Sequence, residues 1–111
     1  MISIIGSGNV GSAIAFLIAS QGLDDITLLN RTKSKAIGES LDISNAIPER
    51  SRISISGTDD YSKIIVIAAS TGIYKTNRVE LLKSQISMIK KIAKNIRDVN
   101  PRCVFLLVSN P

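Results

Sequence analysis

The sequence predicts a doubly wound α/β fold, with a five-stranded parallel sheet in the order 3-2-1-4-5 and helices on both faces. Two observations support this fold class. Apolar, β-branched segments alternate with segments of helical periodicity along the 111 residues, and a glycine-rich stretch lies where the first strand should pass into the first helix. A chain of this length forms one domain with a core of its own.

The strands are predicted from their apolar pattern. The first two are 2–5 and 25–30, and 52–56 alternates polar and apolar residues as a half-buried strand does. The fourth and fifth, 63–70 and 103–109, are almost continuously apolar. Such runs suit parallel strands buried on both faces.

Three helices are predicted between these strands. The first, ended by Gly22, follows from apolar residues at helical spacing, namely Val10, Ala13, Ile14, Leu17 and Ile18. The second begins at Thr32 as its N-cap, runs to about Ile47 and ends at Pro48. The third covers about 78–99, where apolar residues step by four and three, and these are Leu82, Ile86, Ile89, Ala93 and Ile96.

Composition excludes several classes of protein. Only 4% of residues are aromatic and none is Trp, so stacking platforms for single-stranded nucleic acid are not expected. The longest apolar runs are too short to span a bilayer, and the N-terminus lacks the basic region of a signal peptide. Cys103, the single cysteine, lies in an apolar run and is interpreted as a buried core residue in a reducing cytoplasm.

The net charge of +5 is unevenly placed. Residues 1–77 carry seven basic and seven acidic residues, whereas residues 78–111 carry seven basic residues and only Glu80 and Asp98 as acids. The excess is interpreted as the solvated side of the amphipathic helix 78–99. A nucleic-acid surface on that helix is the less favoured alternative.

The most informative motif is Gly6-Ser7-Gly8-Asn9-Val10-Gly11, a G-x-G-x-x-G sequence between a strand and a helix. Gly6 is expected to form the tight turn, Gly8 to let the backbone approach a pyrophosphate, and Gly11 to let helix and strand pack closely. The N–H groups of the helix N-terminus would hold the anion. The sequence therefore predicts a Rossmann-type site for NAD or NADP, against the alternative of a glycine-rich turn without a ligand.

The end of the second strand indicates which cofactor is preferred. An acidic residue here accepts the ribose hydroxyl bonds of NAD, but this chain has Asn30 followed by Arg31. An amide does not repel a 2′-phosphate, and a guanidinium pairs with one. NADP is therefore favoured over NAD. In the alternative, Asn30 binds the ribose of NAD, and Arg31, Lys33 and Lys35 are only solvated.

The order of motifs resembles the N-terminal half of the lactate/malate dehydrogenase family over essentially the whole chain. The segment 36–46 resembles the family's helix after the second strand, and 64–70 resembles its fourth strand. Residues 78–92 resemble the helix that begins Arg-x-Asp-Leu, and "LLVSNP" at 106–111 matches the fifth strand and its Asn-Pro. With the glycines, this last match is the most specific.

The resemblance implies hydride exchange between a nicotinamide cofactor and a small 2-oxo or 2-hydroxy acid. It implies that Arg78 polarises the substrate carbonyl and that Asn110 orients the substrate and the nicotinamide. Without the resemblance, Arg78 is an ordinary first-turn helix residue and Asn110 a turn former before proline. Cofactor contacts are implied for Ala69, Ser70, Gln85, Val108 and Asn110, with Gln85 standing where the family usually has Asn.

Other positions depart from the family pattern. The position that discriminates substrates falls on Gly72 or Ile73, neither of which binds a carboxylate, and Lys75 is only a conceivable substitute. The chain has no histidine to transfer the proton. Residues 1–111 are therefore interpreted as a cofactor-binding domain whose catalytic domain is missing, which binds the cofactor without turnover and self-associates through the open strand 103–108. The alternative is an independent NAD(P)-binding sensor or regulatory module.

Overall fold

The computed structural model describes most of the chain, in the ranges 1–47, 53–55, 62–70, 77–99 and 101–108. All eight predicted elements form. They are β1 (Ile2–Ile5), α1 (Asn9–Ser20), β2 (Ile26–Leu29), α2 (Lys33–Ala46), β3 (Ile53–Ile55), β4 (Ile64–Ile67), α3 (Arg78–Val99) and β5 (Val104–Leu107). Strand β1 has the predicted bounds, whereas β2, β4 and β5 are shorter than the apolar runs that predicted them.

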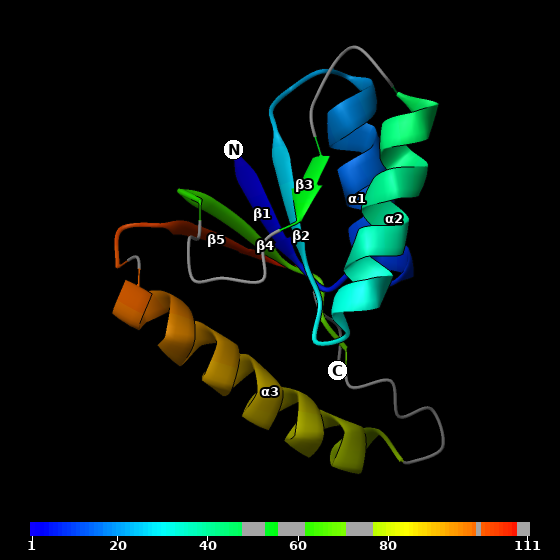
Figure 1. Cartoon of the computed structure of the whole chain (residues 1–111). Helices are drawn as coiled ribbons and strands as arrows, with labels where there is room; N and C mark the ends of the chain where they lie inside the picture. The colour runs from blue at the N-terminus through cyan, green and yellow to red at the C-terminus, as the bar shows by residue number, and fades with distance from the viewer. Residues whose placement is uncertain (48–52, 56–61, 71–76, 100, 109–111) are drawn as a thin grey trace.

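The sheet has the predicted architecture. Its strand order is β3-β2-β1-β4-β5, and every neighbouring pair is parallel. Helices α1 and α2 cover one face, and α3 crosses the other (Figure 1). The connections from β1 and β4 thus leave toward opposite faces, which makes the β1–β4 junction the switch point of the sheet.

The core between the sheet and α1 is built around small helix residues. Gly11, Ala15 and Ala19 form the buried row of α1, four residues apart, and they let the helix approach Ile4 and Leu28 closely. The apolar residues that predicted this helix mark its buried face only in part, since Val10, Ala13 and Leu17 are exposed. The helix was predicted correctly, but the face that packs against the sheet is its row of small residues.

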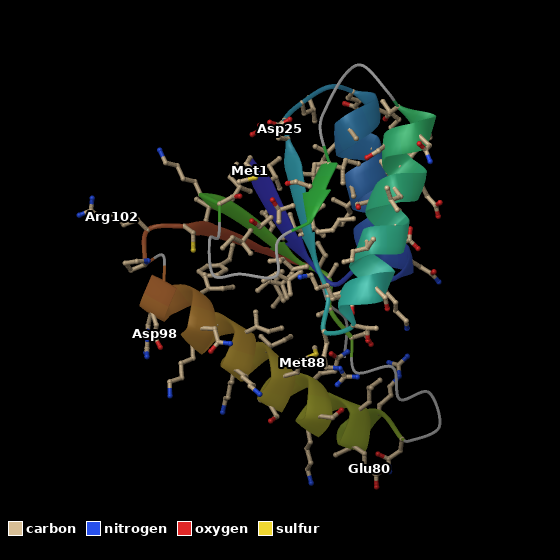
Figure 2. All side chains as sticks on the ribbon, viewed as in Figure 1. Met1, Asp25, Glu80, Met88, Asp98 and Arg102 are labelled. Atoms are coloured by element: carbon tan, nitrogen blue, oxygen red, sulfur yellow. The ribbon has the colours of Figure 1, made fainter. Side chains whose placement is uncertain are left out.

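The core beneath α3 is smaller. Ile65, Ile67 and Ile96 are fully or almost fully buried together. Met88 lies on the side of α3 toward the sheet, whereas Glu80 and Asp98 lie on its outer side (Figure 2). Cys103 packs at the margin of this cluster and is half-buried, so the prediction of a buried core cysteine is wrong in degree. The reason is that β5 is the last strand of the sheet.

A buried hydroxyl pair fastens the start of β4 to β1. Ser3 Oγ donates a hydrogen bond of 2.9 Å to Ser62 Oγ and accepts one of 3.1 Å from the Ser62 N–H. Both serines are buried, so each polar group has a partner where water is excluded. The contact aligns β4 beside β1 and so places the residues after β4 beside the glycine turn.

Candidate functional site

The carboxyl ends of four strands lie in register along one edge of the sheet. Ile5 pairs with Leu29 and Ile67, and Ile67 pairs with Leu107. Beyond these pairs, Gly6 N–H donates to Leu29 O (2.8 Å), and Ala68 N–H donates to Ile5 O (2.9 Å). The predicted cofactor residues that follow these strands are therefore brought to the same edge, where open α/β sheets bind ligands.

Two glycines of the motif are required by the fold itself. Gly6 has a φ of +102°, in the region that favours glycine, and a Cβ there would lie 2.7 Å from the backbone N of Ala69. A Cβ on Gly11 would fall on the carbonyl oxygen of Gly6. The predicted tight turn and the close packing at Gly11 are both confirmed.

Gly8 is different. It is the N-cap of α1, with extended backbone angles that any residue adopts, and a Cβ there would meet nothing within 4 Å. No contact in the described chain therefore explains a glycine at this position. The open space lies at the helix N-terminus, where Asn9 and Val10 are exposed and first-turn N–H groups have no partner within the helix. This arrangement suits a pyrophosphate.

Side-chain hydrogen bonds connect the end of β2 to the glycine turn. Asn30 Nδ2 donates a 2.7 Å hydrogen bond to Ser7 Oγ, and Asn30 Oδ1 accepts a 2.8 Å bond from the Thr32 N–H. Ser7 is only 5% exposed, and Ser12 Oγ donates to its carbonyl at 3.0 Å. Asn30 is thus at the predicted place beside the turn, and its amide is already oriented by protein groups.

The residues after Asn30 are basic and exposed. Thr32 is the N-cap of α2 by position, as predicted, but its side chain makes no capping bond. The first turn of α2 carries no acidic residue, while Arg31, Lys33 and Lys35 are exposed to solvent. The local charge at the end of β2 is therefore positive, with no carboxylate in the position that usually meets a ribose hydroxyl.

The predicted substrate residue Arg78 is the first residue of α3 and is exposed. The helix begins there because Asn77 Oδ1 accepts a 2.9 Å bond from the Glu80 N–H, as an N-cap does. A cation in the first turn opposes the helix dipole, so helix stability does not explain an arginine at this position.

The remaining predicted residues are distributed as follows. Ala69 lies against Gly6, Ser70 is exposed after β4, and Val108 N–H donates to Ile67 O (3.0 Å) at the same edge. Gln85 is 4% exposed, on the buried row of α3. Asn110 lies outside the described residues, as do the substrate-loop positions Gly72, Ile73 and Lys75.

Sequence reasoning missed two residues that shape the site. Ser12 braces the glycine turn through Ser7, and nothing in the sequence singles it out. Asn77 caps α3, and its position three residues before Glu80 is a recognised start signal for a helix.

Other ligand classes find no support in the described chain. Within its described ranges, no group of three or more His, Cys, Asp or Glu is placed to hold a metal ion. None of the helices described is both long and apolar enough to cross a membrane. The pKa of the Asp24 carboxyl is lowered, but Asp24 precedes β2 and so lies at the opposite end of the strands from the glycine turn.

A glycine turn that opens onto a helix N-terminus, at the switch point of a parallel sheet, defines a dinucleotide-binding α/β domain of the Rossmann type. Residues 1–111 match the family described as lactate/malate dehydrogenase, NAD binding domain, and the chain belongs to that family.

Both lactate dehydrogenases and malate dehydrogenases are similar to this chain. L-lactate dehydrogenase A of Hordeum vulgare is 38% identical over 116 residues, which cover 99% of this chain and 33% of the relative. Malate dehydrogenase of Ehrlichia chaffeensis is 32% identical over 117 residues, covering 99% and 37%. The structure of the malate dehydrogenase from Aeropyrum pernix superposes with a TM-score of 0.90 at 31% identity, covering 100% of this chain and 38% of that one. The chain therefore spans about a third of the length of these relatives.

Proposed function

We propose that this chain is the cofactor-binding part of a malate- or lactate-type 2-hydroxy-acid dehydrogenase and that it prefers NADP to NAD. The N–H groups at the start of α1 bind the pyrophosphate, and the end of β2 binds the adenosine ribose. The residues after β4 and β5 lie toward the nicotinamide, whose ring supplies hydride exchange when it is bound.

The observation that carries this proposal is the contrast among the three glycines. Gly6 and Gly11 are explained by contacts within the chain, whereas Gly8 borders open space and has ordinary backbone angles. A side chain at Gly8 would occupy the space in front of the α1 N-terminus, which a bound pyrophosphate needs. In a turn without a ligand, the geometry at Gly8 would not require a glycine.

The NADP preference rests on charge. A carboxylate at the end of β2 would repel a 2′-phosphate, and the chain has the neutral amide of Asn30 there. Asn30 Oδ1 accepts one bond from Thr32 and retains a second acceptor site, so the amide can also bind a hydroxyl. The exposed guanidinium of Arg31 follows directly and can pair with the phosphate through two parallel bonds.

The chemistry toward the substrate needs more than this chain supplies. Arg78 is proposed to place a fixed positive charge beside the carbonyl oxygen of the 2-oxo acid, where negative charge develops during reduction. Asn110 is proposed to orient the same group. Because the chain contains no histidine, we expect the 111-residue chain to bind the cofactor without measurable oxidation of malate or lactate.

The binding site is tested by titrating NADPH and NADH into the purified chain and its Gly8→Ala variant. We expect Gly8→Ala to weaken binding about tenfold or more, since the new methyl group lies in the proposed pyrophosphate site. Gly38→Ala is the matched control, because a Cβ at Gly38 also meets nothing within 4 Å, and Gly38 lies on α2 away from the turn. Equal binding by Gly8→Ala and the parent would contradict the site.

Cofactor preference and catalytic activity are measured separately on the same purified chain. A lower dissociation constant for NADPH than for NADH supports the preference, and the reverse order rejects it without affecting the site. Turnover of malate or lactate by the 111-residue chain would reject only the expectation of inactivity.

A further inference from the structure

The hydroxyl of Ser7 has an incomplete set of hydrogen bonds. Its oxygen accepts a 2.7 Å bond from Asn30 Nδ2, and an amide nitrogen accepts nothing in return. In the part of the chain that the structure describes, no protein group accepts the Ser7 hydroxyl hydrogen. Ser7 is only 5% exposed, so water has little access to it. Because a buried donor without an acceptor is costly, this hydrogen indicates an acceptor that the described chain does not contain.

The orientation of the Asn30 amide follows from its contact with the backbone. The Thr32 N–H is a donor, so the amide atom that it contacts at 2.8 Å is Oδ1, and Nδ2 is left to face Ser7. The bonds therefore run in one direction, from the Thr32 N–H to Asn30 and from Asn30 to Ser7. The Ser7 hydroxyl is the last member of this series and has a hydrogen to donate. Oδ1, which shares a carbon with Nδ2, retains one acceptor site.

These two groups together match a hydroxyl better than a phosphate. A hydroxyl can accept from Ser7 and donate to Asn30 Oδ1, because it is both an acceptor and a donor. A phosphate oxygen could accept from Ser7 but would face the amide oxygen without a hydrogen. Asn30 is half-buried after the end of β2, and Gly8, next to Ser7, is exposed. A ligand along this edge of the sheet can therefore reach both groups.

We propose that Ser7 is a cofactor-binding residue whose hydroxyl donates to the 3′-oxygen of the adenosine ribose, while Asn30 Oδ1 accepts the hydrogen of the same ribose hydroxyl. The contact lies within the cofactor site of the proposed function and so rests on that function. NAD and NADP both carry the 3′-hydroxyl, whereas the 2′-oxygen of NADP bears the phosphate. Asn30 makes the donor available, because a carboxylate at position 30 would accept the Ser7 hydrogen itself.

A double-mutant cycle between protein and ligand tests the contact by calorimetric titration. The ligands are NADH or NADPH, whichever the chain binds more tightly, and the analogue of that cofactor without the 3′-oxygen of the adenosine ribose. Loss of this oxygen should raise the dissociation constant about tenfold in the parent chain. In Ser7→Ala, which keeps only the Asn30 acceptor, the factor should be about threefold or less. Equal factors in the two proteins would overturn the proposal.

Ser12→Ala is the matched control, since Ser12 Oγ holds the same turn by donating to the Ser7 carbonyl at 3.0 Å. A looser turn weakens the binding of both ligands alike, so the factor for the 3′-oxygen should stay at its parent value. An unchanged dissociation constant for the analogue in the parent chain would reject the contact without any variant.

The role of Asn30 is tested by adding Ser7→Ala to the Asn30→Asp variant. In the parent background, Ser7→Ala should raise the dissociation constant of the cofactor about threefold or more. In the Asn30→Asp background the effect should be less than about twofold, because the carboxylate already accepts the Ser7 hydrogen. An equal effect in both backgrounds would show that Asn30 does not direct this hydrogen to the ligand.

Failure of this contact and failure of the proposed function give different results. If the parent chain bound neither NADH nor NADPH, the function and the contact would both be rejected. If it bound a cofactor but the 3′-oxygen contributed equally with and without the Ser7 hydroxyl, only the role of Ser7 would be rejected.

Discussion

The side-chain amide of Asn30 donates a 2.7 Å hydrogen bond to the hydroxyl oxygen of Ser7, joining the end of β2 to the glycine turn across 23 positions of sequence. Ser7 is buried, and the same amide accepts a bond from the Thr32 N–H. The side chain beside the proposed ribose site therefore also holds the turn beside the proposed pyrophosphate site. Changes at Asn30 should act on cofactor choice and on the turn together.

Replacing Asn30 by Asp should reverse the proposed cofactor preference. The carboxylate keeps an acceptor for the Thr32 N–H and can accept from the Ser7 hydroxyl, so the turn is retained. It adds negative charge that repels a 2′-phosphate and accepts ribose hydroxyl bonds. We expect the ratio of the NADPH to the NADH dissociation constant to rise about tenfold or more. Asn45→Asp, at an exposed position near the end of α2, is the charge-matched control, and an unchanged ratio in Asn30→Asp would refute this role.

The Gly6→Ala substitution should destabilise the fold strongly. Its φ of +102° disfavours any side chain, and the new methyl group would lie 2.7 Å from backbone atoms of Ala69. Strained backbone of this kind costs about 1–3 kcal/mol before the steric contact is added. We expect a loss of about 3 kcal/mol or more in the free energy of unfolding, measured by urea denaturation. Gly38→Ala should instead stabilise α2 by about 0.5–1 kcal/mol, and similar midpoints for both variants would contradict this account.

The capping bond of Asn77 should contribute measurably to stability. Asn77→Ala removes the acceptor of the Glu80 N–H and should lower the free energy of unfolding by about 0.5–2 kcal/mol. Asn77→Asp retains the acceptor and should be neutral or stabilising. Thr32→Ala is a useful comparison, because the Thr32 side chain makes no capping bond. If both alanine variants lost equal stability, the capping bond would not be the cause.

The carboxylate of Asp24 should give a small pH dependence. Its pKa lies below the ordinary value of 3.8, first because the Met1 ammonium donates to it at 2.8 Å and next because the Asp25 N–H does. A carboxyl group whose pKa is lower in the folded state stabilises the fold above its unfolded pKa, and this contribution is lost as the pH falls through the lowered value.

We therefore expect Asp24→Asn to shift the urea midpoint slightly near neutral pH and not at a pH well below 3.8. Asp42→Asn removes the same charge from an exposed position on α2 and serves as the control. A shift in Asp24→Asn that persisted at low pH would show that a cause other than this ion pair is responsible.

The fold could be predicted almost entirely from local pattern. Continuous apolar runs identified parallel strands, and helical spacing identified the helices. Their alternation predicted a doubly wound parallel sheet, whose usual strand order 3-2-1-4-5 the structure confirms. The glycine turn was predicted by the same logic, because Gly6 and Gly11 are needed for a turn and a close packing that recur wherever a strand enters such a helix. These features depend on neighbouring residues and on steric rules that apply to any chain.

Which face of each helix is buried was not predictable in this way. Periodicity finds an apolar helix, but the sheet selected Gly11, Ala15 and Ala19 over the larger residues of α1. The half-burial of Cys103 depends likewise on its place beside the last strand. Burial is a property of what packs against a residue, and the partner comes from a distant part of the sequence.

The sequence by itself thus determined the order of elements, the parallel sheet and the place of the glycine turn, because short-range sterics and hydrophobic periodicity specify them. Only the tertiary structure decided that Asn30 would be fastened to Ser7, that Ser3 would bond Ser62 across 59 positions, and that Gly8 would border open space. Such contacts form between segments that meet only after the chain has closed long loops, and no local pattern encodes their geometry.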